Sequence, residues 1–178
     1  MRKENVYDLS GEFGIGYCSN TGTPFYFDLE DYDKIKDYCW VEYVRGSYHS
    51  VEAWNIGSNG NITMNWLITG KNYDHINRNP LDNRKSNLRP CNLYQNAMNS
   101  SIMSNNTSGI TGVNWNKSEQ KWVARIQYYN KRILLGYFNN KDDAIKARLE
   151  AEAKYFKEFA PQKHLFEQYN IEEISNDK

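Results

Sequence analysis

Residues 113 to 135 alternate between apolar and polar side chains in three short runs, and this alternation restricts the fold more than any other feature. Successive side chains of a β-strand point to opposite faces, so period-two alternation predicts strands with one buried face. Residues 117–120 and 129–131 separate the runs at the spacing of hairpin turns. We therefore predict three antiparallel strands. Their inward side chains are Val113, Trp115, Trp122, Ala124, Ile126, Ile133 and Leu135.

A helix is predicted directly after the third strand. Asn140 is a favoured N-cap residue, and Asp142 and Asp143 fall in the first turn, where the helix dipole favours acidic side chains. Small side chains on one helix face would let the helix lie close against the apolar side of the sheet. The residues that share this face are Ala144, Ala147, Ala151 and Tyr155.

Residues 74 to 99 are unusually polar. The stretch reads DHINRNPLDNRKSNLRPCNLYQNAMN, crowded with Asn, Asp and Arg, and lacks the apolar periodicity of a buried strand or helix. It places Asp74 beside His75, followed by Asn87 and Asn96. Such polarity indicates a functional site.

The first 73 residues predict a compact, β-rich support region. Short strands are expected at residues 15–18, 25–27, 40–44 and 62–67, with a turn at 57–60 and a short helix within 28–37. The abundant Tyr and Trp side chains of this region are interpreted as core residues.

Together these patterns predict an α+β chain with several parts. Residues 1–73 form the support region and 74–99 the polar site, together a domain of residues 1–99; a polar linker follows at 100–109. Residues 110–160 form the sheet-and-helix domain, and residues 161–178 an acidic C-terminal tail.

Composition and charge narrow the function. Three scattered cysteines and three histidines argue against a zinc site or a disulfide framework, and the absence of a long apolar run predicts no membrane association and a cytoplasmic location. Net charge is zero, but residues 107–160 hold ten Lys or Arg against six Asp or Glu, whereas residues 1–73 hold six against ten. A phosphate backbone would therefore bind the centre of the chain.

The C-terminal domain carries a family resemblance. The string GVNWNKSEQKWVARIQYYNKRILLGYFNNKDDAIKARLEAEAKYFKEFA resembles the ethylene-response-factor (Apetala-2 type) DNA-binding domain, matching its G-V-x-W, K-W-x-A-x-I and L-G-x-F landmarks. That family inserts a three-stranded sheet into the major groove, so the resemblance implies double-stranded DNA as partner. Several positions usually filled by Arg are Thr, Asn or Gln here, so the family's preferred DNA sequence is not carried over. The implied DNA contacts are Thr111, Asn114, Asn116, Arg125, Gln127, Arg132 and Leu134.

The polar stretch of residues 74–99 also carries a family resemblance. D-H-x11-N-x8-N, with D-N-R-x-x-N-L-R inside it, resembles the HNH endonucleases of phage and intron-homing type, which build a ββα-metal site. The resemblance implies that Asp74 and Asn96 supply oxygen ligands to Mg²⁺ or Mn²⁺, as hard ions prefer. His75 would be the general base, and Asn87 would hydrogen-bond and orient its imidazole. Possible phosphate contacts are Arg78, Arg84, Lys85 and Arg89.

The combined prediction is a site-specific, metal-dependent DNA endonuclease of homing type. It would act as a monomer on DNA, without a small-molecule substrate, in the cytoplasm of a bacterial or phage-infected cell. Related nucleases carry a His-Arg pair just before the motif, where this chain has the run MNWL from Met64 to Leu67. An alternative is therefore a DNA-binding regulator whose nuclease centre has decayed. A third hypothesis is a general DNA-degrading nuclease.

Overall fold

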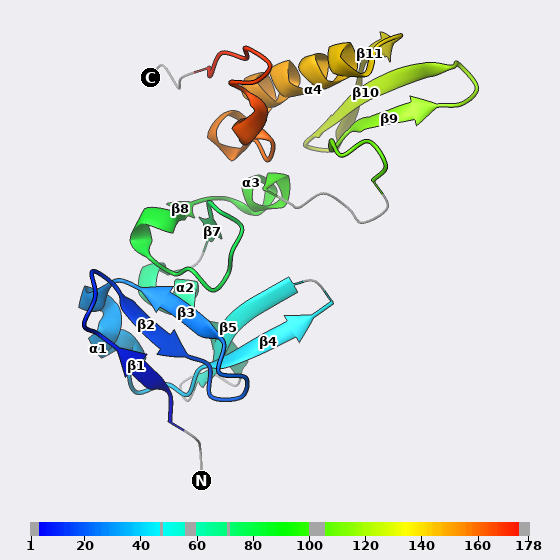
Figure 1. The fold of residues 1–178 in the computed structure, drawn as a ribbon. Coiled ribbons are helices and arrows are strands. Elements are labelled where there is room, and N and C mark those ends of the chain that lie inside the picture. Colours follow the sequence, from blue (N-terminus) through cyan, green and yellow to red (C-terminus); the bar gives the residue numbers. More distant parts are fainter. Residues whose placement is uncertain (1–3, 47, 56–59, 71, 100–105, 175–178) are drawn as a thin grey trace. The chain divides into compact units, whose positions relative to one another are not determined.

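The computed structural model describes residues 4–46, 48–55, 60–70, 72–99 and 106–174 (Figure 1). These residues form small antiparallel sheets and few helices, which confirms the predicted α+β class. The chain divides into two compact units, Met1–Leu93 and Tyr94–Lys178, called unit 1 and unit 2 below. The division falls before residue 99, the predicted end of the nuclease region.

Unit 1 contains two three-stranded antiparallel sheets, in the orders β1-β2-β3 and β4-β5-β6. A 3₁₀ turn at Leu29–Asp31 and a one-turn helix follow the first sheet. They confirm the short helix predicted within residues 28–37. Two strands, β1 and β5, were not predicted. The elements are β1 (Val6–Asp8), β2 (Gly14–Tyr17), β3 (Pro24–Phe27), α1 (Tyr32–Ile35), β4 (Val41–Arg45), β5 (Tyr48–Asn55), β6 (Gly60–Thr63) and α2 (Met64–Thr69).

Aromatic side chains fill the core of unit 1. Phe25, Phe27 and Trp40 are fully buried, and the Trp40 indole N–H donates to the Ile35 carbonyl over 2.9 Å. The cross-strand neighbour of Phe25 is Gly16, where an added Cβ would lie 2.2 Å from the ring. Glycine on β2 therefore lets the Phe25 ring of β3 lie flat across the sheet.

The predicted strand at residues 62–67 is wrong in its second half. β6 ends at Thr63, and α2 begins at Met64. Met64 and Ile68 are both buried, four residues apart on one helix face. Gly70, with φ of 89°, ends the helix. The run was mistaken for a strand because its short apolar sequence fits both periods.

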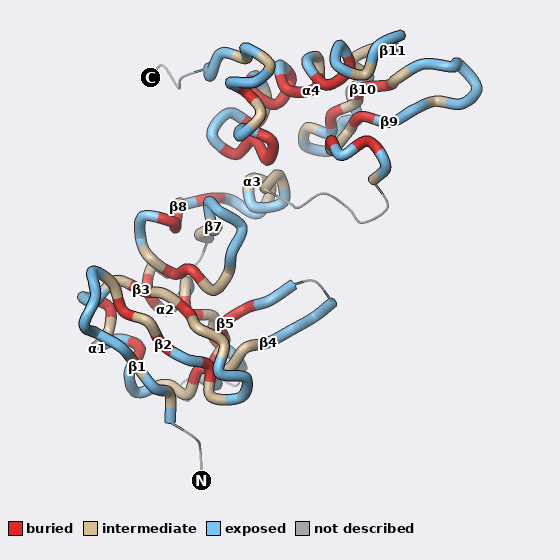
Figure 2. The backbone as a smooth tube through the Cα atoms, in the orientation of Figure 1, coloured by how far each residue is buried: buried red, intermediate tan, exposed pale blue. Residues whose placement is uncertain are grey.

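Unit 2 contains the predicted three-stranded antiparallel sheet, packed on one helix. The strand order is β11-β10-β9, and the helix α4 packs against all three strands (Figure 1). Figure 2 shows much of α4 and the middle of β10 coloured as buried. The elements are β9 (Val113–Asn116), β10 (Lys121–Tyr128), β11 (Lys131–Phe138) and α4 (Lys141–Tyr155).

The predicted faces hold over most of this sheet and fail at two places. Val123 is fully buried although the alternation places it on the face opposite the inward Trp122 and Ala124; a register shift between Ala124 and Arg125 lies beside it. Trp115 was predicted to face inward but is 40% exposed and packs edge-to-face against Trp122. Leu134 is exposed, as predicted.

α4 begins at the predicted N-cap and packs much of its predicted face against the sheet. The Asn140 side chain accepts a hydrogen bond from the Asp142 N–H over 3.0 Å, which confirms the predicted N-cap. Of the predicted alanine face, Ala144 and Ala151 are buried, whereas Ala147 is half-buried. After the helix, the chain packs back onto unit 2 through Phe166, so the predicted acidic tail begins as folded structure.

The predicted linker is described only in part. Residues 100–105 lie outside the described residues. Asn106 accepts a hydrogen bond from the Gly109 N–H over 2.7 Å, and the Ser108 hydroxyl donates to the Val113 carbonyl over 2.6 Å. Residues 106–109 are thus anchored to the start of β9. Among the helices described, none has the length and apolarity to cross a membrane.

Candidate nuclease site and DNA-reading face

The predicted site lies on a strand–loop–strand element of unit 1. β7 (Tyr73–His75) and β8 (Leu88–Pro90) pair antiparallel, joined by a loop that ends in a 3₁₀ turn at Lys85–Asn87. Since β7 ends at His75, this residue stands at the strand terminus, as predicted. The described residues contain no cluster of three His, Cys, Asp or Glu side chains able to share a metal ion.

Asp74 is a buried carboxylate, 7% exposed. The register places Arg89 directly across from it on β8, and the Arg89 Nη2 lies 3.0 Å from the Asp74 Oδ2. A buried carboxylate is costly unless a cation or hydrogen-bond donors compensate it. Arg89 is the cation that compensates the buried Asp74 side chain.

The His75 imidazole is partly buried and contacts Asn83. Its Nε2 lies 3.1 Å from the Asn83 Oδ1. Burial lowers the pKa of His75, although the Asn83 hydrogen bond and the Asp74 and Asp82 carboxylates oppose that shift. A lowered pKa keeps the imidazole neutral near pH 7, which is the form that can accept a proton.

The side chain of Asn87 holds the loop. Its Oδ1 accepts from the Asn77 N–H over 2.9 Å, while its Nδ2 donates to the Asn77 Oδ1 and, over 2.7 Å, to the Asp82 carbonyl. We expected this amide to orient the imidazole, but in the described structure Asn83 makes that contact. The reason is that the 3₁₀ turn directs the Asn87 amide into the loop, where backbone groups need partners.

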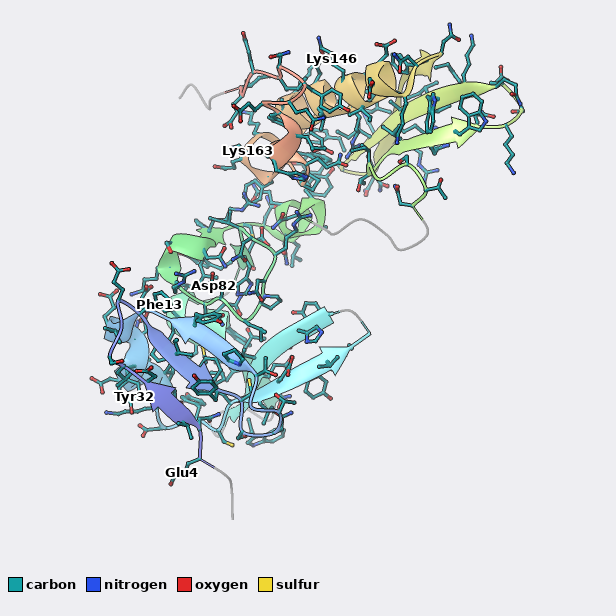
Figure 3. All side chains as sticks on the ribbon, in the orientation of Figure 1. Glu4, Phe13, Tyr32, Asp82, Lys146 and Lys163 are labelled. Carbon is teal, nitrogen blue, oxygen red and sulfur yellow. The ribbon has the colours of Figure 1, made fainter. Side chains whose placement is uncertain are left out.

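Three of the four predicted phosphate contacts are engaged in ion pairs. Arg84 makes two hydrogen bonds to Asp82, which Figure 3 labels, and Lys85 pairs with Glu30. Arg89 pairs with Asp74. Arg78 is exposed, with no acidic partner among the described residues.

Asn96, the other predicted metal ligand, lies on α3 (Leu93–Met98). This helix begins at the last residue of unit 1 and continues in unit 2, and the Asn96 side chain is exposed. In unit 2 the Tyr94 ring stacks on Tyr129, with centroids 4.2 Å apart.

The predicted DNA contacts gather on the sheet of unit 2. Asn114, Gln127 and Arg132 are exposed, and they line a hollow of about 510 Å³ together with Thr111 and Arg125. Five of the seven predicted contacts are thus brought together. Asn116 and Leu134 lie outside the hollow lining, and the Asn116 side chain accepts hydrogen bonds from Ser118 and Glu119 in the following turn.

The chain is similar to Protein 3.8 of Escherichia phage T7. The two are 30% identical over 93 residues, which cover 52% of this chain and 72% of the phage protein. The chain belongs to the Protein 3.8 family. No protein-family model matches the chain, and no solved structure matches it.

In this member of the Protein 3.8 family, further residues hold the candidate site in place, and they were not identified from the sequence. The loop between β7 and β8 is fastened to the edge of β3, where the Tyr26 N–H donates to the Leu81 carbonyl and the Asn83 N–H to the Tyr26 carbonyl, both over 2.8 Å. The Asp28 carboxylate accepts from the Lys85 N–H over 2.7 Å. These contacts give the N-terminal region a role in positioning the site. No local pattern predicts them, because they join residues more than fifty positions apart.

Proposed function

We propose that this chain is a site-specific DNA endonuclease of homing type, which hydrolyses a phosphodiester bond with one divalent metal ion. The observation that carries the proposal is that a buried Asp74 carboxylate and a partly buried His75 imidazole stand next to each other in the sequence at the end of β7. Ionisable groups perturbed by burial and by specific charge partners gather at functional sites. Hydrogen bonds of the Asn87 amide hold the surrounding loop.

The donor set fits a hard cation. The Asp74 carboxylate offers oxygen atoms of the kind that Mg²⁺ and Mn²⁺ prefer, and the other predicted ligand, Asn96 of unit 2, carries an exposed carboxamide oxygen of the same kind. When bound, such an ion would polarise the phosphate and stabilise the leaving oxygen. His75 would accept the proton of the attacking water. Asn87 would act by fixing the loop that carries the site.

Unit 2 would read the DNA sequence. The exposed Asn114 and Gln127 amides suit adenine edges, and the Arg132 guanidinium suits guanine. They lie on one sheet face, and a sheet of this kind fits the major groove. Arg78 of unit 1, exposed and without an acidic partner among the described residues, would contact phosphate. Similarity to a phage protein supports a place in the phage-infected bacterial cell, and one site per chain suits a monomer that nicks DNA.

A nicking assay tests the proposal. Supercoiled plasmid and phage genomic DNA are incubated with Mg²⁺ and the wild type, His75→Ala or His164→Ala, the last an exposed histidine outside the site. We expect nicking by the wild type and His164→Ala, loss with His75→Ala of at least about 100-fold, and loss in EDTA. A wild type that binds DNA without nicking it would refute the endonuclease.

One observation favours the alternative, a DNA-binding regulator with a decayed nuclease centre. The Arg89 guanidinium already neutralises the Asp74 carboxylate at 3.0 Å, as a metal ion otherwise would. A regulator would bind DNA equally well with or without Mg²⁺, and His75→Ala would leave its binding unchanged. The same assay, with DNA binding measured in parallel, separates the two functions.

A further inference from the structure

We propose that Asn83 is the positioning residue that fixes His75 in the tautomer with the proton on Nε2, so that Nδ1 accepts the proton of the attacking water. The inference rests on the proposed nuclease function for its catalytic meaning. The tautomer itself follows from the hydrogen bonds of the site and is measurable without any activity.

The orientation of the Asn83 amide is set by Pro80. The Asn83 Nδ2 lies 3.2 Å from the Pro80 carbonyl oxygen, which can only accept a hydrogen bond. The amide nitrogen must therefore face Pro80, and the amide oxygen must face the imidazole. The Pro80 carbonyl thus distinguishes the amide nitrogen from the amide oxygen, which have nearly the same shape.

The amide oxygen in turn sets the imidazole. The Asn83 Oδ1 lies 3.1 Å from the His75 Nε2, and an amide oxygen can only accept. Nε2 must therefore carry a proton. A neutral imidazole has one protonated and one unprotonated ring nitrogen, so Nδ1 holds the lone pair.

Asn83 is well fixed for this task. It is 1% exposed, and its backbone N–H donates to the Tyr26 carbonyl of β3 over 2.8 Å. The Tyr26 N–H also donates to the Leu81 carbonyl, so backbone hydrogen bonds to β3 hold the loop on both sides of Asp82. A strand of the folded core thus holds the amide against the ring, and loss of such a supporting contact typically costs about 10- to 100-fold in activity.

The test reads the tautomer of the full-length chain directly. Long-range ¹H–¹⁵N correlation spectra are recorded at about pH 8, where an imidazole is neutral. The chain has three histidines, and His49→Gln and His164→Gln assign the His75 signals. The spectra compare the wild type with three variants: Asn83→Ala, Asn83→Asp, which keeps an acceptor oxygen, and Asn79→Ala.

Asn79→Ala is the matched control. Asn79 lies in the same loop, and its side-chain oxygen accepts from the Leu81 N–H over 3.2 Å, so Asn79→Ala removes a loop hydrogen bond that does not involve the imidazole ring. We expect the Nε2-protonated tautomer in the wild type, Asn83→Asp and Asn79→Ala, and a mixture of both tautomers in Asn83→Ala. A wild type protonated on Nδ1, or an Asn83→Ala spectrum identical to the wild type, would overturn the inference.

Nicking kinetics complete the test. We expect Asn83→Ala to lower kcat about 10- to 100-fold with an unchanged KM for DNA, and Asn83→Asp to restore most of it. If the wild type binds DNA without nicking while the tautomer still depends on Asn83, the endonuclease function fails and the tautomer assignment stands. If the wild type nicks but Asn83→Ala nicks equally fast, the positioning role fails and the nuclease stands.

Discussion

At the scale of single residues, unit 2 depends on one buried polar network. Arg148 and Glu152 form an ion pair one turn apart on α4, 2.8 Å between the Arg148 Nη2 and the Glu152 Oε1, with both side chains almost fully buried. The Gln162 amide donates to the Glu152 carboxylate over 2.6 Å and accepts from the Thr111 N–H over 2.7 Å. Gln162 thus ties the end of the chain to α4 and to the segment before β9.

Gln162→Ala should destabilise unit 2 by about 2 kcal/mol or more, because it leaves a buried carboxylate and a backbone N–H short of partners. The measurement is urea unfolding, followed at the amide NMR signals of residues 106–174. Gln168→Ala, an exposed Gln in the same segment, should stay within about 0.5 kcal/mol of the wild type. Equal effects of the two substitutions would contradict the network.

Some site residues could be predicted from the sequence and others could not. Asp74 and His75 were predicted from their adjacency in a polar stretch, and the structure places them at the end of β7. Asn83 lies in the same polar stretch, but nothing local marks it as the partner of His75. Asn83 reaches His75 because backbone hydrogen bonds between Tyr26 and the loop fix the position of Asn83, and these bonds join residues far apart in the chain.

At the scale of elements, hydrophobic periodicity predicted the long strands and the long helix but not the bulge or the short helix. The sheet β9–β11 and α4 were predicted because long amphipathic segments carry a strong period and a clear helix start. The register shift beside Ala124 escaped prediction because a bulge changes the alternation without changing composition. α2 was missed because six residues are too few to separate a period of two from one of 3.6.

Asn140→Ala should weaken α4, and with it the sheet it covers, by about 1 kcal/mol, because the Asp142 N–H loses its side-chain acceptor. Asn140→Asp should be close to the wild type, since Asp is an equally good N-cap. The neighbouring Asn139→Ala, an exposed position without a cap role, provides the control. Chemical denaturation of the three variants measures the difference, and a loss with Asn139→Ala as large as with Asn140→Ala would contradict the cap.

At the scale of the whole molecule, two compact units carry different chemistry. Unit 1 holds the candidate site around the buried Asp74 and the partly buried His75, whereas unit 2 presents polar and basic side chains on one sheet face. Under the proposed function unit 1 would cut DNA and unit 2 would read its sequence, and joining the two would raise the local concentration of the cutting site near chosen sequences. The net charge of the chain is zero because the acidic ends offset the basic centre, so net charge alone does not reveal the uneven distribution of charge.

Removing the reading contacts while keeping the nuclease site intact tests this division of labour. The double variant Gln127→Ala with Arg132→Ala changes two exposed side chains of the hollow in unit 2. Each lost base contact should reduce discrimination between DNA sequences by about 1–3 kcal/mol, which is roughly 5- to 150-fold per contact. We therefore expect nicks at many more positions of a phage genome, mapped by sequencing the cut ends.

The matched control is Lys146→Ala with Gln168→Ala, which removes one basic and one amide side chain from exposed positions outside the hollow; Lys146 lies on α4 (Figure 3). It should leave the cut positions of the wild type unchanged, because neither residue belongs to the sheet face. If the Gln127 and Arg132 variant also keeps the wild-type positions, unit 2 does not select the site. The chain would then behave as a general DNA-degrading nuclease, whose selectivity does not depend on its C-terminal sheet.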